Sequence, residues 1–518
     1  MLPRVFAGEL AGTEKRPSLI KLKKRYSGIG RDGPGAHGGP SEVVGSMSDV
    51  AALFTTLRAS ADKQAVDMLE ALVRNGSDRD LNRINAIVFA ARHGLNEETV
   101  IGAFLHAARL GIFELLWNVL CPGCGSVLDS NASLKTLNQE HYSCALCAAG
   151  YEPTLDEMVE VTFTVSPRVR RIAAHDPDSL PFWEFFRQIF FGSGLELNRP
   201  GQSLEEVARE VVLDSLELTT GERAILSLYL PAGFIMILEP VTHWAQFIDV
   251  NGEPTQERQN LSVVLDQSAY ATTDMIEMHP GPVRIAFGNR ANRRVLPVIW
   301  VATGKLEELL SQRRPFLTAK RLFTNQTFRD IYRTDTLDVD QRLKITSLTF
   351  LFTDLKGSTQ LYDRVGDLVA FDLVRAHFRV LHEIVASESG AVVKTIGDAV
   401  MATFPTPDRA VSAALKMRDA MRSLGGEHRS EDLLLKIGIH AGPCLAVSLN
   451  DRQDYFGHTV NIASRVQGLA ASRSIFATKP VVEYPEAAKL LRISGIDPMS
   501  RRYALSGIAE EFAVYEIP

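Results

Sequence analysis

Two aspartates that end apolar strands constrain this chain more than any other feature. Residues 347–353 alternate in a way that predicts a buried strand, and Asp354 opens the small-residue loop that follows. Forty-four residues later, two alternating runs flank the pair Gly397-Asp398. Such a pair is typical of a tight hairpin, with Asp398 at its tip. We therefore expect a sheet that carries both carboxylates at neighbouring strand ends.

Paired carboxylates of this kind can hold two divalent cations about 3.5 to 4 Å apart. Mg²⁺ takes few protein carboxylates and completes its coordination with phosphate oxygens, so a sparse site suits a nucleoside triphosphate. Gly357 and Ser358 would add backbone N–H groups at the start of the next helix, where phosphate binds readily. The alternative interpretation is that both aspartates only cap turns.

A third stretch, residues 454–465, offers two more polar side chains at helical spacing. A helix is expected to begin near His458, and Asn461 and Arg465 are four residues apart in it. Residues with this spacing lie on one face of a helix, so the two side chains could contact one ligand together.

With these three pieces in place, the sequence resembles the class III nucleotidyl cyclases over about residues 345–518. The matching blocks are FTDLKGST at 352–359, KTIGD at 394–398 and DYFGHTVNIASR at 454–465. Several separated blocks agree in order and spacing, which makes the resemblance specific. It implies a ferredoxin-like α/β catalytic domain, a lyase that makes a cyclic nucleotide and pyrophosphate.

The resemblance also implies roles for individual residues. Asp354 and Asp398, helped by the backbone carbonyl of Leu355, would bind two Mg²⁺ or Mn²⁺ ions. Asn461 and Arg465 would orient the ribose and stabilise charge on the α-phosphate. The ribose 3′-oxygen would then attack the α-phosphorus in line with the departing pyrophosphate.

Lys394 and Asp454 match the pair that reads the purine in that family. An ammonium can donate to N1 of adenine, and a carboxylate can accept from its N6 amine. Guanine presents the opposite pattern at these edges, so we expect an adenylate cyclase that binds ATP. A guanylate cyclase and a catalytically silent nucleotide-binding regulator are the alternatives.

The resemblance further places the cation pair and the purine readers on opposite subunits of a head-to-tail dimer. This chain carries both sets, so a homodimer with two equivalent sites at its interface is expected. One departure concerns a lysine that many members have near the C-terminus. Ser506 stands in its place here, and Arg501 and Arg502 are the nearest basic residues.

Length and composition suggest a soluble protein of several domains. The chain has 518 residues, 45% of them hydrophobic, and a net charge of −6, so binding to a polyanion is not expected to be its main role. It shows neither a signal sequence nor a transmembrane run, which favours the cytoplasm. The resemblance to the cyclases implies a role in intracellular signal transduction. Residues 1–46 are rich in Gly and basic residues and predict a disordered tail.

Residues 47–120 have helical apolar spacing and predict a helical domain. Two helices joined by a short turn resemble a helix-turn-helix, which raises DNA binding as an alternative. Glu97 and Glu98 begin the second of these helices, where DNA phosphates would require neutral or basic groups. No DNA partner is therefore expected.

Four of the five cysteines form two knuckles in residues 121–155. Cys121 and Cys124 form the first, and Cys144 and Cys147 form the second, with nineteen residues between the two. This spacing predicts a zinc ribbon with one structural Zn²⁺ held by four thiolates. Two redox-active dithiols or two disulfides are the alternatives.

Residues 156–336 alternate in several short runs and predict a β-rich regulatory module. Trp244 and Asn289 could line a ligand pocket there, although core and turn roles are the simpler interpretation. Together with the zinc knuckles, the segment 320–329 resembles an uncharacterised module found ahead of bacterial cyclase domains. The fold expected for the whole chain is thus α+β and multidomain, with a catalytic domain at 345–518 that the preceding half regulates.

Overall fold

The computed structural model covers the chain with several internal gaps, and helices and β-sheets are mixed throughout. None of the helices in the described parts is long and apolar enough to cross a membrane. The predicted tail, the connector around residue 336 and Ser506 lie outside the described residues. The described residues are 47–136, 141–196, 206, 208–266, 275–302, 304–332, 343–356, 363, 365–427, 434–449, 452–470, 474–505 and 511–518.

The N-terminal part packs four helices against a three-stranded antiparallel sheet. Asparagine and aspartate side chains cap three of the helices, as in Asn96, which accepts a hydrogen bond from the Thr99 N–H at 3.2 Å. Phe104 of the fourth helix stacks on Phe163 of the sheet with ring centroids 4.7 Å apart. The elements are α1 (Met47–Ser60), α2 (Lys63–Asn75), α3 (Ala86–His93), α4 (Glu97–Arg109), β1 (Phe113–Leu120), β2 (Val127–Asn131) and β5 (Val159–Val165), in the sheet order β2-β1-β5.

Between β2 and β5 lies a two-stranded hairpin, β3 (Tyr142–Cys144) with β4 (Ala149–Tyr151), which carries the second cysteine knuckle. β5 is buried along its whole length and pairs with β1 across this insertion. Strand β5 therefore completes a sheet whose first strand, β1, precedes the cysteines. The domain boundaries predicted at residues 120 and 155, on either side of the zinc ribbon, stay predictions.

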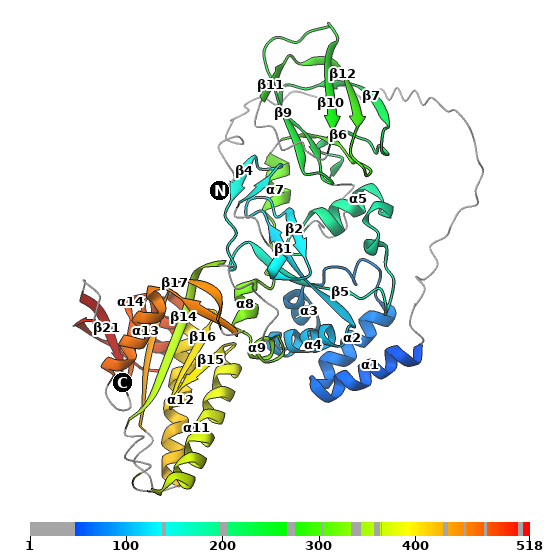
Figure 1. Ribbon diagram of the computed structural model, residues 1–518. Helices are drawn as coiled ribbons and strands as arrows, with labels where there is room; N and C mark the ends of the chain where they lie inside the picture. The colour runs from blue at the N-terminus through cyan, green and yellow to red at the C-terminus, as the bar shows by residue number, and fades with distance from the viewer. Residues whose placement is uncertain are drawn as a thin grey trace.

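The middle of the chain forms two packed sheets, drawn in green in Figure 1. Their facing side chains share one apolar core, which includes Ile237, Ile285 and Trp244. One sheet has the order β10-β12-β7 and the other β11-β9-β8-β13-β6. The strands are β6 (Val212–Ser215), β7 (Arg223–Leu230), β8 (Gly233–Glu239), β9 (Trp244–Val250), β10 (Gln259–Leu265), β11 (Met275–Met278), β12 (Gly281–Asn289) and β13 (Val298–Val301).

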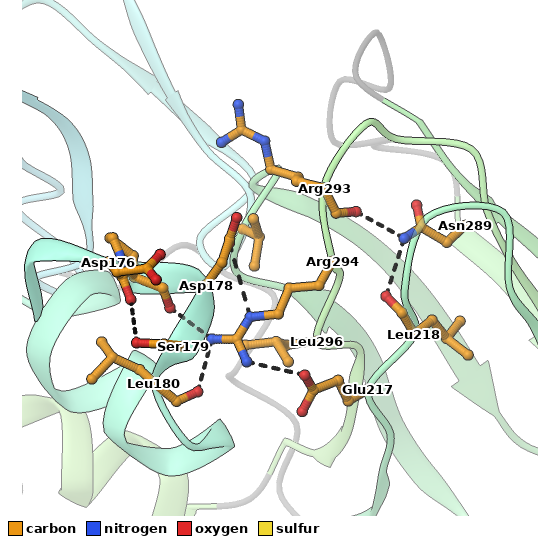
Figure 2. Close-up of polar contacts among 12 residues, drawn as sticks. Asp176, Asp178, Ser179, Leu180, Glu217, Leu218, Asn289, Arg293, Arg294 and Leu296 are labelled. Carbon is orange, nitrogen blue, oxygen red and sulfur yellow. Dashed lines mark hydrogen bonds and ion pairs between the residues drawn. The ribbon is translucent and has the colours of Figure 1, made fainter. Parts of the chain in front are cut away.

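Polar contacts fix these sheets to the chain just before an aromatic segment (Figure 2). Arg294 donates to the carbonyl oxygens of Pro177 and Leu180 at 2.7 and 2.8 Å and to Glu217 at 3.0 Å. The Asn289 amide donates to the carbonyl oxygens of Leu218 and Arg293. Asn289 therefore has the structural role that was the simpler interpretation. The aromatic segment comprises α5 (Phe182–Phe185) and the π-helical turn η5 (Phe186–Phe190).

The C-terminal part is built on one eight-stranded sheet with helices on both faces. Leu351 points into a core beneath α11 and α12, whereas its neighbours Phe350 and Phe352 face the opposite side. The strands run in the order β15-β16-β14-β17-β19-β21-β20, with β18 paired to β17. The elements are β14 (Leu343–Lys356), α11 (Asp367–Ser387), β15 (Ala391–Ile396), β16 (Ala399–Phe404), α12 (Pro407–Glu427), β17 (Leu434–Leu449), β18 (Arg452–Phe456), α13 (His458–Leu469), β19 (Ile475–Thr478), α14 (Lys479–Val482), α15 (Pro485–Ile493), β20 (Met499–Ala504) and β21 (Glu511–Ile517).

Helix α13 lies close against β17 because Gly438 has no side chain. A Cβ atom at Gly438 would lie 2.2 Å from the backbone nitrogen of Gln467. This approach holds α13 on the same face of the sheet as Phe350 and Phe352.

Two short helices fill the space between the N-terminal part and this sheet (Figure 1). They are α8 (Ala319–Phe323) and α9 (Gln326–Ile331), which follow α7 (Gly304–Ser311). Phe323 and Phe328 belong to one apolar core that runs from α4 through these helices to Phe350 and Tyr455 of the C-terminal sheet.

Candidate functional site

The hairpin predicted around Gly397-Asp398 is present, and it carries one of the two acidic residues. β15 and β16 pair antiparallel on either side of the turn, with Ile396 opposite Ala399. Gly397 has φ 64°, a left-handed conformation that residues with a Cβ rarely adopt. Asp398 follows it and is partly buried. The turn therefore places Asp398 at the end of the hairpin that β15 and β16 form.

Asp354 lies near the end of the central strand β14, next to this hairpin. The preceding residue, Thr353, accepts a hydrogen bond from the Val400 N–H at 3.1 Å, which ties the strand to β16. Burial raises the pKa of Asp354, and the negative charge of Asp398 raises it further. The two carboxylates are therefore close enough to repel one another.

The acidic pair has the features of a divalent cation site. The Oδ2 atom of Asp398 is buried and has no hydrogen-bond partner among the described residues. A buried carboxylate oxygen without a partner costs free energy, and a bound cation would satisfy it and relieve the repulsion. Mg²⁺ and Mn²⁺ prefer such oxygen ligands. Leu355, whose carbonyl was predicted to assist, directly follows Asp354 on β14.

Lys394 and Asp454, predicted to read a purine, form an ion pair. The Lys394 Nζ atom lies 2.5 Å from Asp454 Oδ2, although 60 residues separate them in the sequence. The lysine side chain is 44% exposed and the aspartate side chain 14% exposed. β15 and β18 thus bring together a donor and an acceptor that a ligand can reach from one side.

Asn461 and Arg465 lie on α13, the helix predicted to begin near His458 and observed from His458 to Leu469. Asn461 is exposed and Arg465 partly buried. Within the described residues, neither side chain bonds to the acidic pair or to Lys394. Gly357 and Ser358 lie outside the described residues.

Sequence reasoning missed two polar neighbours of Asp354. Lys436 sits opposite it on β17 and its charge lowers the pKa of Asp354, in the opposite sense to Asp398. The Gln467 side chain also hydrogen-bonds to Asp354. The position of Lys436 at the start of an apolar strand is a signal that the sequence contains. Its pairing with Asp354 depends on the register between two strands, which the sequence does not reveal.

The four predicted zinc ligands gather in one cluster. Their sulfur atoms all lie within 4.8 Å of one another. The Sγ atoms of Cys121 and Cys147 are 3.6 Å apart, and those of Cys124 and Cys144 are 3.5 Å apart. All four cysteines are buried, and none forms a disulfide. Tetrahedral coordination with Zn–S bonds of about 2.3 Å separates sulfurs by about 3.8 Å. The cluster therefore fits one Zn²⁺ better than disulfides.

Two family models match the chain, one on each side of residue 335. The model described as "Family of unknown function (DUF5939)" matches residues 47–330. The model described as "Adenylate and Guanylate cyclase catalytic domain" matches residues 341–500. These matches confirm the predicted resemblance in both halves of the chain.

The first curated relatives match between 23% and 33% of this chain. An adenylate cyclase 2 of Rhizobium meliloti is 33% identical over 132 residues, which cover 23% of this chain and 36% of the relative. Guanylate cyclase 32E of Drosophila melanogaster is 29% identical over 140 residues, 25% of this chain and 12% of the relative. The chain spans little more than a third of the first curated relatives at most.

Among solved structures, the adenylyl cyclase CyaB from P. aeruginosa is 23% identical to this chain. The likeness covers 34% of this chain and 96% of that one, with a TM-score of 0.31.

Proposed function

Since the chain belongs to the family of unknown function DUF5939 and carries an adenylate and guanylate cyclase catalytic domain at its C-terminal end, we propose that it is an adenylate cyclase regulated by its N-terminal half. The reaction converts ATP to 3′,5′-cyclic AMP and pyrophosphate. A ferredoxin-like arrangement of the C-terminal sheet and helices is part of this proposal.

The observation that carries the choice of ATP is the Lys394–Asp454 pair. The two side chains are 2.5 Å apart and partly open to solvent, so an adenine edge can contact both. The Lys394 ammonium donates to N1, and Asp454 accepts from the N6 amine. Guanine carries a donor at N1 and an acceptor at O6, which would place donor against donor and acceptor against acceptor.

Asp354, Asp398 and the Leu355 carbonyl are the groups that would hold Mg²⁺ or Mn²⁺. Bound there, the ions supply positive charge where negative charge develops on the transferring phosphorus. The two carboxylates would hold these ions, and only through them the triphosphate, because carboxylates alone repel phosphate groups. The buried Asp398 Oδ2 atom, which has no hydrogen-bond partner in the described part of the chain, supports this role.

Asn461 and Arg465 act on the sugar and the α-phosphate. Asn461 is exposed on α13 and can position the ribose, while the Arg465 guanidinium can donate to α-phosphate oxygens. With the ribose held, the 3′-oxygen forms a bond to the α-phosphorus, and the bond from that phosphorus to the α–β bridging oxygen breaks. The hydroxyl proton leaves to solvent.

A homodimer is the proposed active form. Apolar side chains are exposed beside the purine readers: Ile396, two residues after Lys394, is 53% exposed, and Phe456, two residues after Asp454, is 65% exposed. Exposed apolar residues grouped around a site favour a protein partner. A second copy would cover them and would bring its purine readers to the acidic pair.

Direct turnover tests the substrate assignment. Purified full-length protein with Mn²⁺ or Mg²⁺ should form more cyclic AMP from ATP than cyclic GMP from GTP, measured separately by chromatography. Lys394→Glu removes the donor to adenine N1, so the ratio of kcat/KM for ATP over GTP should fall by about 10- to 100-fold. A wild-type preference for GTP would support the guanylate cyclase alternative. Absence of turnover with both nucleotides would favour a silent regulator.

The proposed regulation rests on contacts between α9 and the strands that carry the purine readers. Arg329 donates to the carbonyl oxygen of Gln453 at 2.8 Å, next to Asp454 in the chain. It also reaches the carbonyl oxygen of Val393 at 3.4 Å, next to Lys394. One guanidinium of the N-terminal half therefore holds the backbone beside both members of the pair.

The N-terminal helices hold this segment in turn. Glu98 at the start of α4 forms an ion pair with Arg321 of α8 and accepts a hydrogen bond from the Asn325 amide at 2.7 Å. A shift of α4 would thus displace α8 and α9 against the hairpin. Such a shift is the proposed route by which the N-terminal half changes activity.

Arg329→Ala should raise the KM for ATP by about tenfold, because charged hydrogen bonds to two carbonyl groups are lost. Arg329→Lys should recover part of the affinity, since one donor remains. Arg375→Ala, which removes an exposed arginine of α11, is the matched control. Steady-state kinetics with ATP and GTP distinguish two effects. Misplaced purine readers would change KM and the nucleotide preference, whereas partial unfolding would lower only the amount of active protein. An unchanged KM and unchanged ATP preference in Arg329→Ala would contradict the role.

A further inference from the structure

A cleft in the N-terminal part carries an unexplained excess of positive charge. It has a volume of about 230 Å³ and lies between the α2–α3 segment, helix α3 and the chain after α5. It belongs to the half of the chain matched by the family of unknown function.

Five arginines and two carboxylates line the cleft among the described residues. Arg79 is paired with Glu184 and Arg314 with Glu196. The other lining carboxylate, Asp80, accepts hydrogen bonds from Ser77. The carboxylates nearby are thus already engaged. The lining arginines are Arg79, Arg83, Arg92, Arg187 and Arg314.

Three of the lining arginines form no ion pair within the described part of the chain: Arg83, Arg92 and Arg187. Arg92 is exposed on α3, at the mouth of the cleft. Arg187 is partly buried, and burial lowers its pKa, as does the positive charge of Arg79 to a smaller extent, while the negative charge of Glu184 raises it. A bound anion would offset the excess of guanidinium over carboxylate groups in the lining of the cleft.

Buried polar atoms in the cleft wall also lack partners. The Nε atom of Arg187 and the Oε1 atom of Gln188 are buried without a hydrogen bond among the described residues. Gln188 is only 7% exposed, and its amide nitrogen is fixed by a 2.8 Å bond to Glu184. A guanidinium donor and an amide acceptor from consecutive residues, both without a partner among the described residues, match a ligand with an oxyanion and a hydroxyl or amine group.

Arg83 is held in the wall at a conformational cost. Its φ of 46° lies in the left-handed region that non-glycine residues rarely adopt. Its N–H donates to Thr164 Oγ1 at 3.0 Å and its guanidinium to the Ile189 carbonyl oxygen. Burial lowers the pKa of Arg83 to about 10, so it stays charged at neutral pH. Strained residues that persist at a concave site are typical of binding sites.

We propose that this cleft binds a small organic oxyanion through Arg92, Arg187 and Gln188. The recognised group is a phosphate or a carboxylate, which a guanidinium contacts with two parallel hydrogen bonds. Ile84, Val88 and Phe191 form an apolar wall against which the rest of the ligand packs. The proposal concerns binding by the N-terminal half and holds whether or not the C-terminal half is an active cyclase.

The position of the cleft suits a signal input. Helix α3 forms one wall, and α3 packs against α4, whose Glu98 holds α8. An anion that draws Arg92 toward Arg187 would move α3, and α4 with it.

Isothermal titration of the full-length protein with inorganic phosphate and, separately, with citrate tests the proposal. One of the two anions should bind, and which one does identifies the recognised group. Arg187→Gln and Arg92→Gln should each weaken that binding by about tenfold, since each removes one charge-assisted contact. Arg92→Gln alters only an exposed side chain, so it separates loss of binding from loss of folding.

Arg223→Gln, which removes an exposed arginine of β7, should leave binding unchanged. The proposal is overturned if neither anion binds at millimolar concentration. It is also overturned if an anion binds with the same affinity to the wild type, Arg187→Gln and Arg92→Gln, because the binding would then occur elsewhere.

Discussion

Replacing Asp398 with asparagine is expected to abolish cyclic nucleotide formation and leave the protein folded. The loss of one carboxylate from the acidic pair removes several kcal/mol of charge stabilisation, which corresponds to a rate loss of about a thousandfold or more. Unfolding by heat should occur at or above the wild-type midpoint. The change acts on a partly buried carboxylate whose Oδ2 atom has no hydrogen-bond partner among the described residues and whose charge repels Asp354.

The matched control is Asp497→Asn, which neutralises an exposed aspartate beyond α15 and should keep full activity. A mixture provides a second check. Suppose that the acidic pair and the purine readers of each site come from opposite subunits. A dimer of one Asp398→Asn subunit and one Lys394→Ala subunit then has one intact site of two. Half of the dimers in an equal mixture are of this kind, so the mixture should show about a quarter of the wild-type activity. Wild-type turnover by Asp398→Asn alone would refute the cation assignment.

The purified chain should contain one Zn²⁺, and replacing Cys144 with alanine should remove it. Structural zinc contributes on the order of 10 kcal/mol to the folding of small four-ligand sites. That is comparable with the whole stability of a typical domain. The region around β1 to β5 should therefore lose its protection from proteases, as measured by limited proteolysis with metal content from atomic spectroscopy.

Cys444→Ala is the control for this experiment. Cys444 is also buried and unbonded, but it lies in the C-terminal sheet, outside the four-cysteine cluster. It should keep the zinc and the protease resistance of the N-terminal half. If Cys144→Ala retained one zinc per chain, or if the wild type bound none, the structural metal assignment would be wrong.

Local signals in the sequence were enough to predict the parts of the candidate site that depend on local structure. The turn at Gly397 needs a left-handed residue, and helix α13 needs only its own spacing, so both were readable from neighbouring residues. The Lys394–Asp454 contact depends on the sheet, yet the motif resemblance indicated it and the structure places the two atoms 2.5 Å apart.

Features that depend on distant strand pairing were not predictable in this way. β5 looks like the first strand of the β-rich segment, but it pairs with β1 because the cysteine hairpin is inserted between them. Similarly, Lys436 meets Asp354 only through the register of β14 and β17. In the sequence, Arg329 is one more basic residue of a short polar segment. Only the tertiary structure shows that its guanidinium donates to the carbonyl oxygen of Gln453.

The apolar core that passes from α4 through Phe323 and Phe328 to Phe350 has a further consequence for how the protein unfolds. Residues of both halves share this core, so neither half has a complete interior of its own at that boundary. Severing the chain there would expose Phe350 and Tyr455 to water and favour aggregation of the isolated catalytic half. The regulatory and catalytic halves of the intact chain should accordingly unfold in one transition on heating, and both should lose their function at the same temperature.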